Sequence, residues 1–257
     1  MRHRIAAALV ACAVLAAVPA GADAAPYPDR TQLDQVREYV KHRGGVVGVA
    51  IVNSRGKVRG VHGRQRFATA SVVKAMLLVA YLRRVANHDR ELTRHERSLL
   101  GPMIRKSSNS AADWAYQRVG DWRLRRLARR AGMHQFDVCC RWTLAQFSAR
   151  DQAKFFWRMD DLTPKRFRPY ADRLLRRIVP RQSWGIPRVA RKRGFRVRFK
   201  GGWRDTTSGE LVHQVGFLSY GNTRFTLAVL TDGNPSKRYG IHTIRGITRR
   251  LVTPPPD

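Results

Sequence analysis

Three short groups of polar residues have the types and the order needed for covalent chemistry at a serine. Ser71 lies three residues before Lys74, and residues three apart share one face of a helix. Ser71 falls where an apolar, helix-favouring segment begins, and backbone N–H groups at a helix start point outward and favour negative charge. A hydroxyl beside an amine in that setting is suited to act as an activated nucleophile.

The other two groups follow later in the chain. Ser107-Ser108-Asn109 offers a second hydroxyl and an amide that donates and accepts hydrogen bonds, in a polar break between two expected helices. Lys200-Gly201-Gly202 is expected at the end of a strand, where small residues let a substrate approach the strand edge and Lys200 adds positive charge. Taken singly, each group has an ordinary explanation as a helix cap or a surface cation. Their joint order is what points to catalysis.

The hydrophobic pattern indicates which elements position these groups. Apolar residues at helical spacing predict helices over 31–43, 71–84, 93–104, 111–119, 122–131, 149–159, 166–179 and 237–251. Apolar β-branched or alternating runs predict strands over 46–52, 58–67, 195–200, 211–219 and 224–230. Because the strands lie near both termini, we expect an α+β fold, with an antiparallel five-stranded sheet built from both termini, packed helices and an inserted all-helical block.

The same pattern predicts a single domain over residues 26–257. Its sheet draws on about 31–67 and 195–252, and its helical region covers about 71–190. The hydrophobic content of 43% is enough for a sizeable core and argues against a disordered chain. No internal repeat and no long linker divides this region.

Residues 1–25 have the pattern of a secretory signal peptide. Arg2 and Arg4 precede an apolar run over 5–18, and Ala22-Asp23-Ala24 resembles a cleavage site. We therefore expect an exported protein, cleaved near Ala24. A lipoprotein box ending at Cys12 is the less favoured interpretation, because apolar sequence continues beyond that cysteine.

The charge of the chain is strongly positive. Lys and Arg number 50 against 18 Asp and Glu, and the formal net charge of +32 predicts attraction to polyanions. The sequence has no zinc-finger spacing, no aromatic run of an RNA-recognition motif and no basic leucine-zipper heptads. A solvated basic surface is thus favoured over specific nucleic-acid binding, with electrostatic contact to anionic envelope polymers as the remaining expectation.

Once Cys12 has left with the signal, Cys139 and Cys140 are the remaining cysteines. Adjacent cysteines form a strained vicinal disulfide, pair with another chain or stay reduced. We favour two partly buried thiols without a catalytic role. His95-Glu96 is not followed by the second histidine of a zinc motif, since Leu99 stands there, so we expect neither a metal site nor a cofactor.

Ser71-Val72-Val73-Lys74, Ser107-Ser108-Asn109 and Lys200-Gly201-Gly202 resemble an ordered set of motifs. The set is S-x-x-K, S-x-N and K-[ST]-G of class A β-lactamases and penicillin-binding proteins. Trp184-Gly185-Ile186-Pro187 and the closing strand–strand–helix pattern are similar too. The resemblance covers nearly all of residues 26–257 and implies a β-lactamase/transpeptidase-like serine hydrolase.

The resemblance also implies roles for single residues. Ser71 would be the acylated nucleophile, Lys74 the base with a lowered pKa, and Ser107 the proton relay to the leaving nitrogen. The implied substrate-binding residues are Asn109, Lys200, Gly202 and Trp203. Among these, Asn109 would bind the substrate amide and help hold Lys74, Lys200 would favour an anionic substrate, and the backbone N–H of Trp203 would complete an oxyanion hole with that of Ser71.

Two departures from the motif set affect the expected activity. Gly201 replaces the usual Thr or Ser and removes a hydroxyl that would bind a substrate carboxylate; the nearby hydroxyl and cationic candidates to replace it are Arg204, Thr206 and Thr207. The chain has no Glu between Glu96 and Glu210 to activate the deacylating water of class A enzymes.

Within 132–143 the only acid is Asp137, for which we favour a turn role, and Thr143 and Gln146 are poor bases. The sequence therefore predicts acylation at Ser71 followed by slow deacylation. The expected substrates are β-lactam-type or D-alanyl-peptide amides, handled by a monomer. The alternatives are a D,D-peptidase-like enzyme and a weakly active cell-envelope binding protein that retains the fold.

Overall fold

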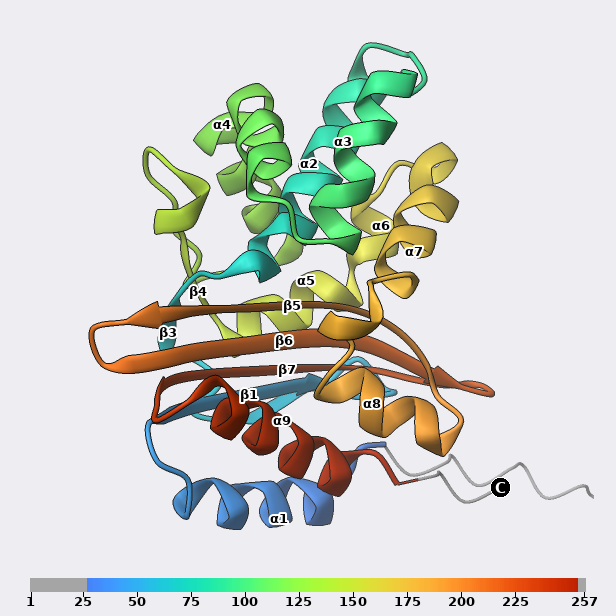
Figure 1. Cartoon of the computed structure of the whole chain (residues 1–257). Helices are drawn as coiled ribbons and strands as arrows, with labels where there is room; N and C mark the ends of the chain where they lie inside the picture. Colours follow the sequence, from blue (N-terminus) through green and yellow to red (C-terminus); the bar gives the residue numbers. More distant parts are fainter. Residues whose placement is uncertain (1–26, 254–257) are drawn as a thin grey trace, which may run out of the picture.

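An antiparallel sheet with strand order β2-β1-β7-β6-β5 crosses the molecule, and both ends of the chain contribute to it (Figure 1). The computed structural model describes residues 27–253. The five strands are β1 (Val46–Val52), β2 (Val58–Val61), β5 (Arg196–Thr206), β6 (Gly209–Tyr220) and β7 (Thr223–Asn234). β1 pairs with β7 along its whole length, so the predicted joining of N- and C-terminal segments in one sheet is confirmed.

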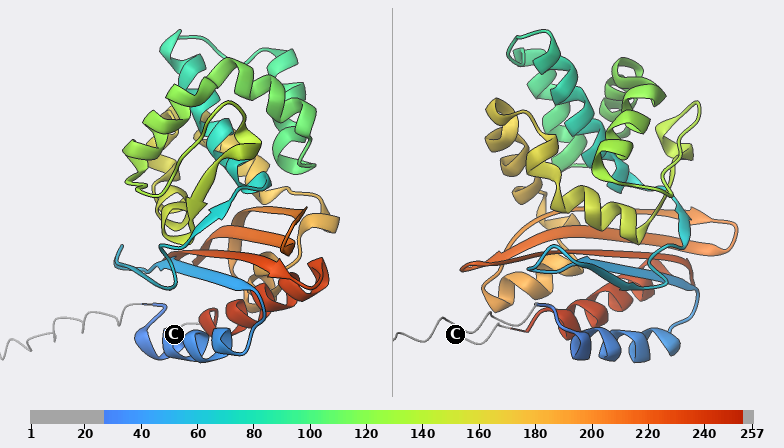
Figure 2. Two further views of the ribbon diagram at one scale, coloured as in Figure 1. Left: turned by 90° about the vertical axis from the view of Figure 1, so that its left-hand side faces the viewer. Right: turned by 180° about the vertical axis from the view of Figure 1, so that it is seen from behind.

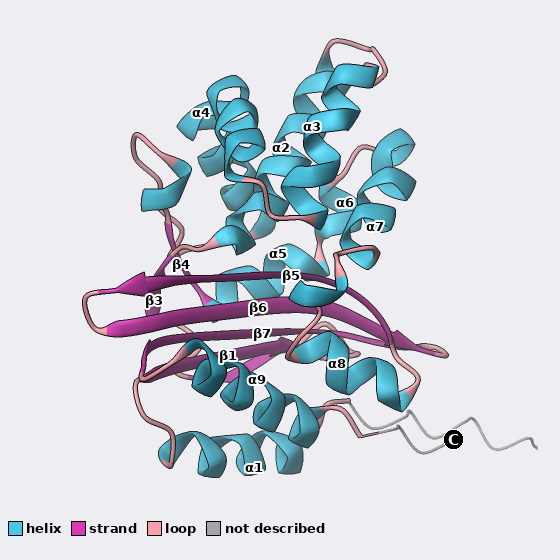
Figure 3. Cartoon of the chain, in the orientation of Figure 1, coloured by secondary structure: helices cyan, strands magenta, loops and turns pink. Residues whose placement is uncertain are grey.

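Helices cover both faces of the sheet (Figures 1 and 2). One face packs against α1 (Arg30–Lys41), α8 (Ile186–Ala190) and α9 (Lys237–Leu251). The other face carries α5 (Ala149–Trp157) and, beyond it, a helical block: α2 (Lys74–Asn87), α3 (Arg94–Arg105), α4 (Asn109–Ala131), α6 (Met159–Leu162) and α7 (Arg168–Arg176). The predicted α+β class with an inserted helical block is therefore confirmed (Figure 3).

Helix α2 is the centre of the helical block. Every residue from Lys74 to Leu82 is buried, as expected for a helix that is apolar on nearly all sides. Helices α3 and α4 pack directly against it. Because Lys74 opens this helix, its amine lies inside the protein, where burial controls its protonation.

The expected strand over 58–67 is wrong, because the chain leaves the main sheet in the middle of it. β2 ends at Val61, and His62 adopts a φ of +47° in the turn that follows. The chain then forms β3 (Arg66–Ala68), which pairs with β4 (Gln146–Ser148) in a separate two-stranded sheet. The turn directs the chain from the sheet toward the helical block, and β4 was not predicted.

The expected end of a strand at Lys200 is also wrong, because β5 continues to Thr206. Its ladder with β6 runs through the two glycines, with Lys200 opposite Val215 and Gly202 opposite His213. Glycines weaken a strand in isolation, but pairing with a long neighbour overrides that preference. Lys200 consequently lies in the middle of this edge strand, where pairing with β6 restrains it.

Other predicted elements match in type and differ at their ends. The two helices expected over 111–119 and 122–131 are the two halves of α4, which bends at Gly120 with φ +67° and ψ 170°. The loop expected over 180–194 contains the short helix α8, and the helix expected over 166–179 is shortened to α7.

The predicted signal peptide lies outside the described residues. Within residues 27–253, no helix combines the length and the apolar character that crossing a membrane requires.

Candidate active site

Ser71 opens a short 3₁₀ helix, Ser71–Val73, that leads directly into α2 at Lys74. The segment before it is fixed on two sides. The backbone N–H of Thr69 donates to the carbonyl of Ala145 at 2.8 Å, and the ring of His213 faces the carbonyl of Ala68 at 3.0 Å. Burial lowers the pKa of His213 to about 4, so at neutral pH its uncharged ring donates to Ala68 and fixes the chain just before Ser71.

Gly202 lets strand β5 run against the start of this helix. A Cβ at this position would lie 2.5 Å from the backbone nitrogen of Ser71, closer than any side chain permits. Only glycine therefore allows the approach. It brings the backbone of Gly202 and Trp203 beside Ser71, and Trp203 and Ser71 line the same cavity.

Lys74 is fully buried and is held by two oxygen acceptors. Its Nζ donates to the backbone carbonyl of Ser107 at 2.7 Å and to Oδ1 of Asn109 at 2.6 Å, and it lies 4.9 Å from the ring centre of Trp142. Burial lowers the pKa of Lys74 to about 8, while the charge of Asp113 raises it. In the neutral amine, two N–H bonds can serve the two acceptors, and the lone pair stays free to accept a proton.

Lys200 is the second fully buried lysine. Its Nζ donates to the hydroxyl of Ser107 at 3.0 Å and to the carbonyl of Gly201 at 2.7 Å. Burial, and after it the charge of Lys74, lowers the pKa of Lys200 well below its ordinary value.

Ser107 connects the two lysines. Its carbonyl accepts from Lys74 and its hydroxyl accepts from Lys200. Its φ of +62° is uncommon for a residue with a side chain. Such backbone strain persists where the surrounding contacts impose it and is frequent at functional sites. The serine is thus held so that its backbone and side chain face different amines.

Of the three residues of the second motif, it is the middle one, Ser108, that caps helix α4. The hydroxyl of Ser108 accepts from the backbone N–H of Ala111 at 3.3 Å at the start of α4. Ser107 and Asn109 are therefore not used as caps, and both remain available to the lysines.

The cavity in front of Ser71 has a volume of about 570 Å³. We call it the nucleophile cavity, and the residues that line it are Ser71, Lys106, Ser107, Asn109, Arg181, Gln182, Trp203 and Lys237. Three of them are cations and none is acidic. The Nζ of Lys237 lies 3.7 Å from the ring centre of Trp203, and burial lowers the pKa of Lys237, against the opposing charge of Glu210.

A second cavity of about 560 Å³ shares Asn109 with the first. We call it the water-side cavity, and its lining is Asn109, Asp113, Tyr116, Gln117, Cys140, Arg141, Trp142 and Thr143. Its one carboxylate is that of Asp113, whose Oδ1 accepts from the indole N–H of Trp142 at 2.7 Å. No glutamate was expected on this side of the site, and the acid that does line the cavity is Asp113.

Comparison with known proteins identifies the fold that carries this geometry. A family model described as "Beta-lactamase enzyme family" matches residues 97–253. The chain belongs to this β-lactamase family. No curated protein matches the chain.

Solved structures of β-lactamases and of a penicillin-binding protein share the fold. The β-lactamase of Sphaerobacter thermophilus DSM 20745 has 20% identity and a TM-score of 0.73 over 86% of this chain and 96% of its own. The structure titled "Structure of PBP-A" has 19% identity and a TM-score of 0.74, over 87% and 95%. A class A β-lactamase representative from Bacteroides cellulosilyticus DSM 14838 has 15% identity and a TM-score of 0.76, over 88% and 97%. At these identities the likeness concerns the fold.

The third motif of this β-lactamase-like protein departs from the usual sequence for a packing reason. A Cβ at Gly201 would lie 3.3 Å from two ring atoms of Trp184. Trp184 in turn packs edge-on against Trp203, with ring centres 5.9 Å apart. A threonine at this position would therefore be in tight contact with the indole of Trp184, which would have to shift by a few tenths of an ångström.

Sequence candidates for replacing the lost hydroxyl do not line the nucleophile cavity. Thr206 donates to the carbonyl of Gly209 at 2.8 Å in the turn between β5 and β6, and neither Arg204 nor Thr207 is among the lining residues. The side chains that do line it, Lys237 and Arg181, lie in other elements and were missed. They carried no motif, and only the fold brings them to Ser71.

Asp113 was missed for a different reason. The sequence predicted no water-activating acid, because only a glutamate or an acid within 132–143 was considered, whereas Asp113 lies one turn after Asn109 on α4. Helical spacing alone, at i and i+4, would have placed both side chains on one face. Asp137, in contrast, pairs with Arg125 at 2.7 Å and bridges to Gln146, consistent with the favoured turn role.

The preferred description of the cysteines is wrong. Cys139 and Cys140 are bonded to each other as a vicinal disulfide, and both are exposed rather than partly buried. The backbone N–H of Cys140 donates to Asp121 at 2.9 Å, so the loop that carries the pair is tied to α4. Within residues 27–253, no cluster of three or more His, Cys, Asp or Glu side chains has a metal-binding arrangement.

Proposed function

We propose that the protein is a serine hydrolase that forms an acyl-enzyme at Ser71 with β-lactam-type or D-alanyl-peptide amides. The observation that carries this proposal is the bridge by Ser107 between two buried lysines beside Ser71. Two buried amines at one serine are costly to keep, and a lysine with a lowered pKa is a common activator of a nucleophile.

In the acylation step, neutral Lys74 takes the proton of the Ser71 hydroxyl as its oxygen attacks the amide carbonyl. The backbone N–H groups of Ser71 and Trp203 hold the oxygen that becomes negatively charged. One such donor is worth about 3 kcal/mol in a serine hydrolase. The carbon–nitrogen bond then breaks, and the leaving nitrogen receives a proton through the hydroxyl of Ser107, which Lys200 orients.

The substrate carries an anionic group, in this proposal. Lys106, Arg181 and Lys237 line the nucleophile cavity with no acidic side chain among the lining residues. Lys237 is restrained by the ring of Trp203, next to the backbone that approaches Ser71. We assign Lys237, with Arg181, to the carboxylate that the missing hydroxyl at position 201 does not bind.

Hydrolysis of the acyl-enzyme is slow. Thr143 lines the water-side cavity and provides a hydroxyl, which is a poor base at neutral pH. The carboxylate of Asp113 is there, but one of its oxygens is occupied by the indole of Trp142. A protein of related fold has been captured in this state, since one solved structure is a mutant of PBP-A described as an acyl-enzyme complex with penicillin G.

The decisive experiment is to incubate the purified protein with penicillin G and follow its mass. We expect an adduct of the mass of penicillin that persists for minutes to hours and is absent in the Ser71→Ala variant. Tryptic mapping should place it on the peptide containing Ser71. An adduct that survives in Ser71→Ala would assign the nucleophile to another residue, and no adduct at millimolar penicillin would refute the proposal.

A weakly active binding protein is the second candidate, and the sparse water-side cavity favours it. A D,D-peptidase-like enzyme would instead release D-alanine from a D-alanyl-D-alanine peptide. Steady-state assays with that peptide and with a chromogenic β-lactam separate the two. The binding protein would consume at most one equivalent of each compound, whereas the peptidase would continue to release D-alanine.

Export is also a proposal. It rests on the pattern of residues 1–25, and retention at the envelope rests on the net charge of +32. Fractionation of cells that express the full chain tests the first. Release of the protein from isolated cell walls by rising salt tests the second, because attraction between exposed charges is screened by salt.

A further inference from the structure

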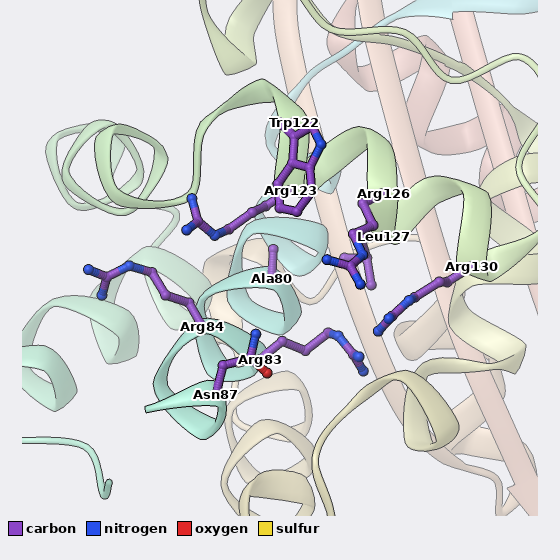
Figure 4. A pocket seen from close by; sticks show the side chains of 9 residues that line it. All are labelled: Ala80, Arg83, Arg84, Asn87, Trp122, Arg123, Arg126, Leu127 and Arg130. Atoms are coloured by element: carbon purple, nitrogen blue, oxygen red, sulfur yellow. The ribbon is translucent and has the colours of Figure 1, made fainter. Parts of the chain in front are cut away.

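A second cluster of chemistry-bearing side chains lies at the other ends of α2 and α4. It lines a pocket of about 110 Å³ formed by Ala80, Arg83, Arg84, Asn87, Trp122, Arg123, Arg126, Leu127 and Arg130 (Figure 4). Arg84 follows Lys74 by ten residues on the same helix, which is about 15 Å along the helix axis. This arginine pocket is therefore separate from the nucleophile cavity, and shares no lining residue with it.

The bend of α4 at Gly120 creates the pocket. The backbone there is left-handed, with φ +67°, a conformation that glycine adopts without strain. After the bend, the second half of α4 runs across α2, and Leu127 is buried against it. Trp122 and three arginines of α4 are thereby presented next to Arg83 and Arg84.

The five arginines of this pocket have no acidic partner. Within residues 27–253, none of them forms an ion pair. Arg83 donates to the carbonyl of Leu162 at 2.8 Å and Arg123 to that of Val119 at 3.3 Å. The guanidinium groups of Arg84, Arg126 and Arg130 make no hydrogen bond to another described residue, so their donors are available to a ligand.

The arrangement suits a ligand with several adjacent negative charges. In Figure 4 the guanidinium groups of Arg83, Arg126 and Arg130 lie on one side of the pocket, and those of Arg84 and Arg123 extend to the other. Planar guanidinium groups bind phosphate oxygens through paired hydrogen bonds. A single phosphodiester carries one charge, whereas a diphosphate carries two or three and spans two guanidinium groups.

Trp122 adds an apolar surface to the charge. Its side chain is 58% exposed and is the one aromatic side chain that lines the pocket. The guanidinium groups of Arg126 and Arg123 lie 5.1 and 5.8 Å from its ring centre. An organic group attached to a bound anion would find a flat surface at this position.

We propose that the arginine pocket binds a diphosphate group, with Trp122 packing against the organic group that the diphosphate carries. This inference is independent of catalysis at Ser71. It rests on five arginines without an acidic partner that line one small cavity beside an exposed tryptophan.

The molecule contains a matched control for this proposal. Another cavity, of about 250 Å³, is lined by Val189 and five cations, namely Arg188, Lys192, Arg193, Arg245 and Arg249. It carries the same number of positive charges as the arginine pocket but no aromatic side chain. Arg188 and Arg249 are exposed, and their guanidinium groups make no hydrogen bond to a described residue, so both can be replaced as safely as Arg126 and Arg130.

The test is calorimetric titration of the full-length mature protein with inorganic pyrophosphate at a fixed ionic strength near 0.15 M. Two double variants remove equal charge, R126Q/R130Q in the arginine pocket and R188Q/R249Q in the control cavity. We expect the first to weaken pyrophosphate binding at least about tenfold and the second to change it less than about twofold. Sulfate should bind at least about tenfold more weakly than pyrophosphate to the wild type.

Equal weakening by the two double variants would overturn the proposal, because the attraction would then belong to the net charge. Pyrophosphate binding no tighter than that of sulfate would overturn it as well. Thermal unfolding followed by circular dichroism confirms that both variants fold. Trp122→Ala should leave the affinity for pyrophosphate unchanged and weaken that for adenosine diphosphate, used as a probe with a flat organic group; no difference between the two ligands would refute the role of Trp122.

A diphosphate can be soluble or attached to a membrane lipid. Vesicles of phosphatidylcholine with diacylglycerol pyrophosphate separate these sources, with phosphatidylcholine alone as the control. Retention of the wild type but not of R126Q/R130Q would assign a lipid headgroup. Pyrophosphate binding without retention on the vesicles would assign a soluble ligand.

Discussion

The two cavities that share Asn109 differ in the reactive groups found at each. In the nucleophile cavity, Ser71 is followed by a buried lysine with a lowered pKa, and Ser107 is hydrogen-bonded to both buried lysines. In the water-side cavity, the one carboxylate already serves an indole N–H, and Thr143 provides only a hydroxyl. The first cavity carries the groups that the proposed acyl transfer uses, and the second offers no fully free carboxylate as a base for water.

Under the proposed function, this fold carries the groups for the first half of a two-step reaction but not those for the second. The first half would use α2, the start of α4 and β5, and the second the first turns of α4 together with the loop over 132–145. Because burial around Lys74 is imposed by the core of the helical block, it persists whatever residues that loop contains. Substitutions in either cavity should change this difference, and replacement of Lys74 should have the largest effect.

Replacing Lys74 should remove the proposed base of the acylation step. We expect Lys74→Arg to slow acylation by penicillin G about a thousandfold, because a guanidinium keeps the charge but cannot accept a proton. The rate is measured by mass spectrometry at several penicillin concentrations. Lys165→Arg, the same change at an exposed position, should leave the rate within about twofold. A Lys74→Arg variant as fast as the wild type would exclude Lys74 as the base.

Adding a carboxylate to the water-side cavity should supply a base for water and speed hydrolysis of the acyl-enzyme. We expect Thr143→Glu to shorten the lifetime of the acyl-enzyme about a hundredfold, which is typical of a positioned general base. The lifetime is followed as loss of the mass adduct after free penicillin is removed. Thr143→Gln has the same size without the base and should have a much smaller effect. Equal lifetimes for the two variants would show that hydrolysis is limited elsewhere.

The pH dependence of acylation should report Lys74. Its pKa of about 8 lies below the ordinary value for lysine because of burial, so the neutral base is the minor form at pH 7 and the major form above pH 8. The second-order rate constant should therefore rise about tenfold per pH unit between pH 6 and 8 and level off above that. A profile that is flat from pH 6 to 8 would contradict a base with this pKa.

The smallest effect concerns the substrate carboxylate. We expect Lys237→Met to slow acylation by penicillin G about fivefold, since a partly exposed charge pair contributes on the order of 1 kcal/mol. The methyl ester of penicillin G lacks the carboxylate and should react with the variant and the wild type at similar rates. If acylation by both compounds is slowed equally in the variant, Lys237 acts by packing against Trp203 and does not bind the carboxylate.

The order of motifs and elements was readable from the sequence because local chemistry determines it. Ser71 and Lys74 are neighbours on consecutive helical turns, and Ser107 and Asn109 flank a helix cap, so their proximity follows from short-range geometry. The strands from both termini were recognisable from their β-branched runs, and an antiparallel sheet is their simplest common arrangement. The membership of the chain in the β-lactamase family agrees with that prediction.

Predictions from the sequence failed where a partner that is distant in sequence determines the local structure. Strand β5 continues through Gly201 and Gly202 because β6 pairs with it, and β3 exists only through its ladder with β4. The tight contact that a side chain at position 201 would make with the ring of Trp184 could not be predicted either, because Trp184 is distant in sequence. Asp113, Lys237 and the arginine pocket carry no motif, since their meaning comes from neighbours remote in sequence.

Three features could be predicted from the sequence alone: the three ordered motifs, the α+β class and the lack of a glutamate between Glu96 and Glu210. These depend on residue identity and spacing, which are local properties of the chain. Only the tertiary structure decided that Lys74 and Lys200 are fully buried and meet at Ser107. Desolvation by the folded core, which no local pattern records, lowers the pKa of Lys74 to about 8 and that of Lys200 well below its ordinary value.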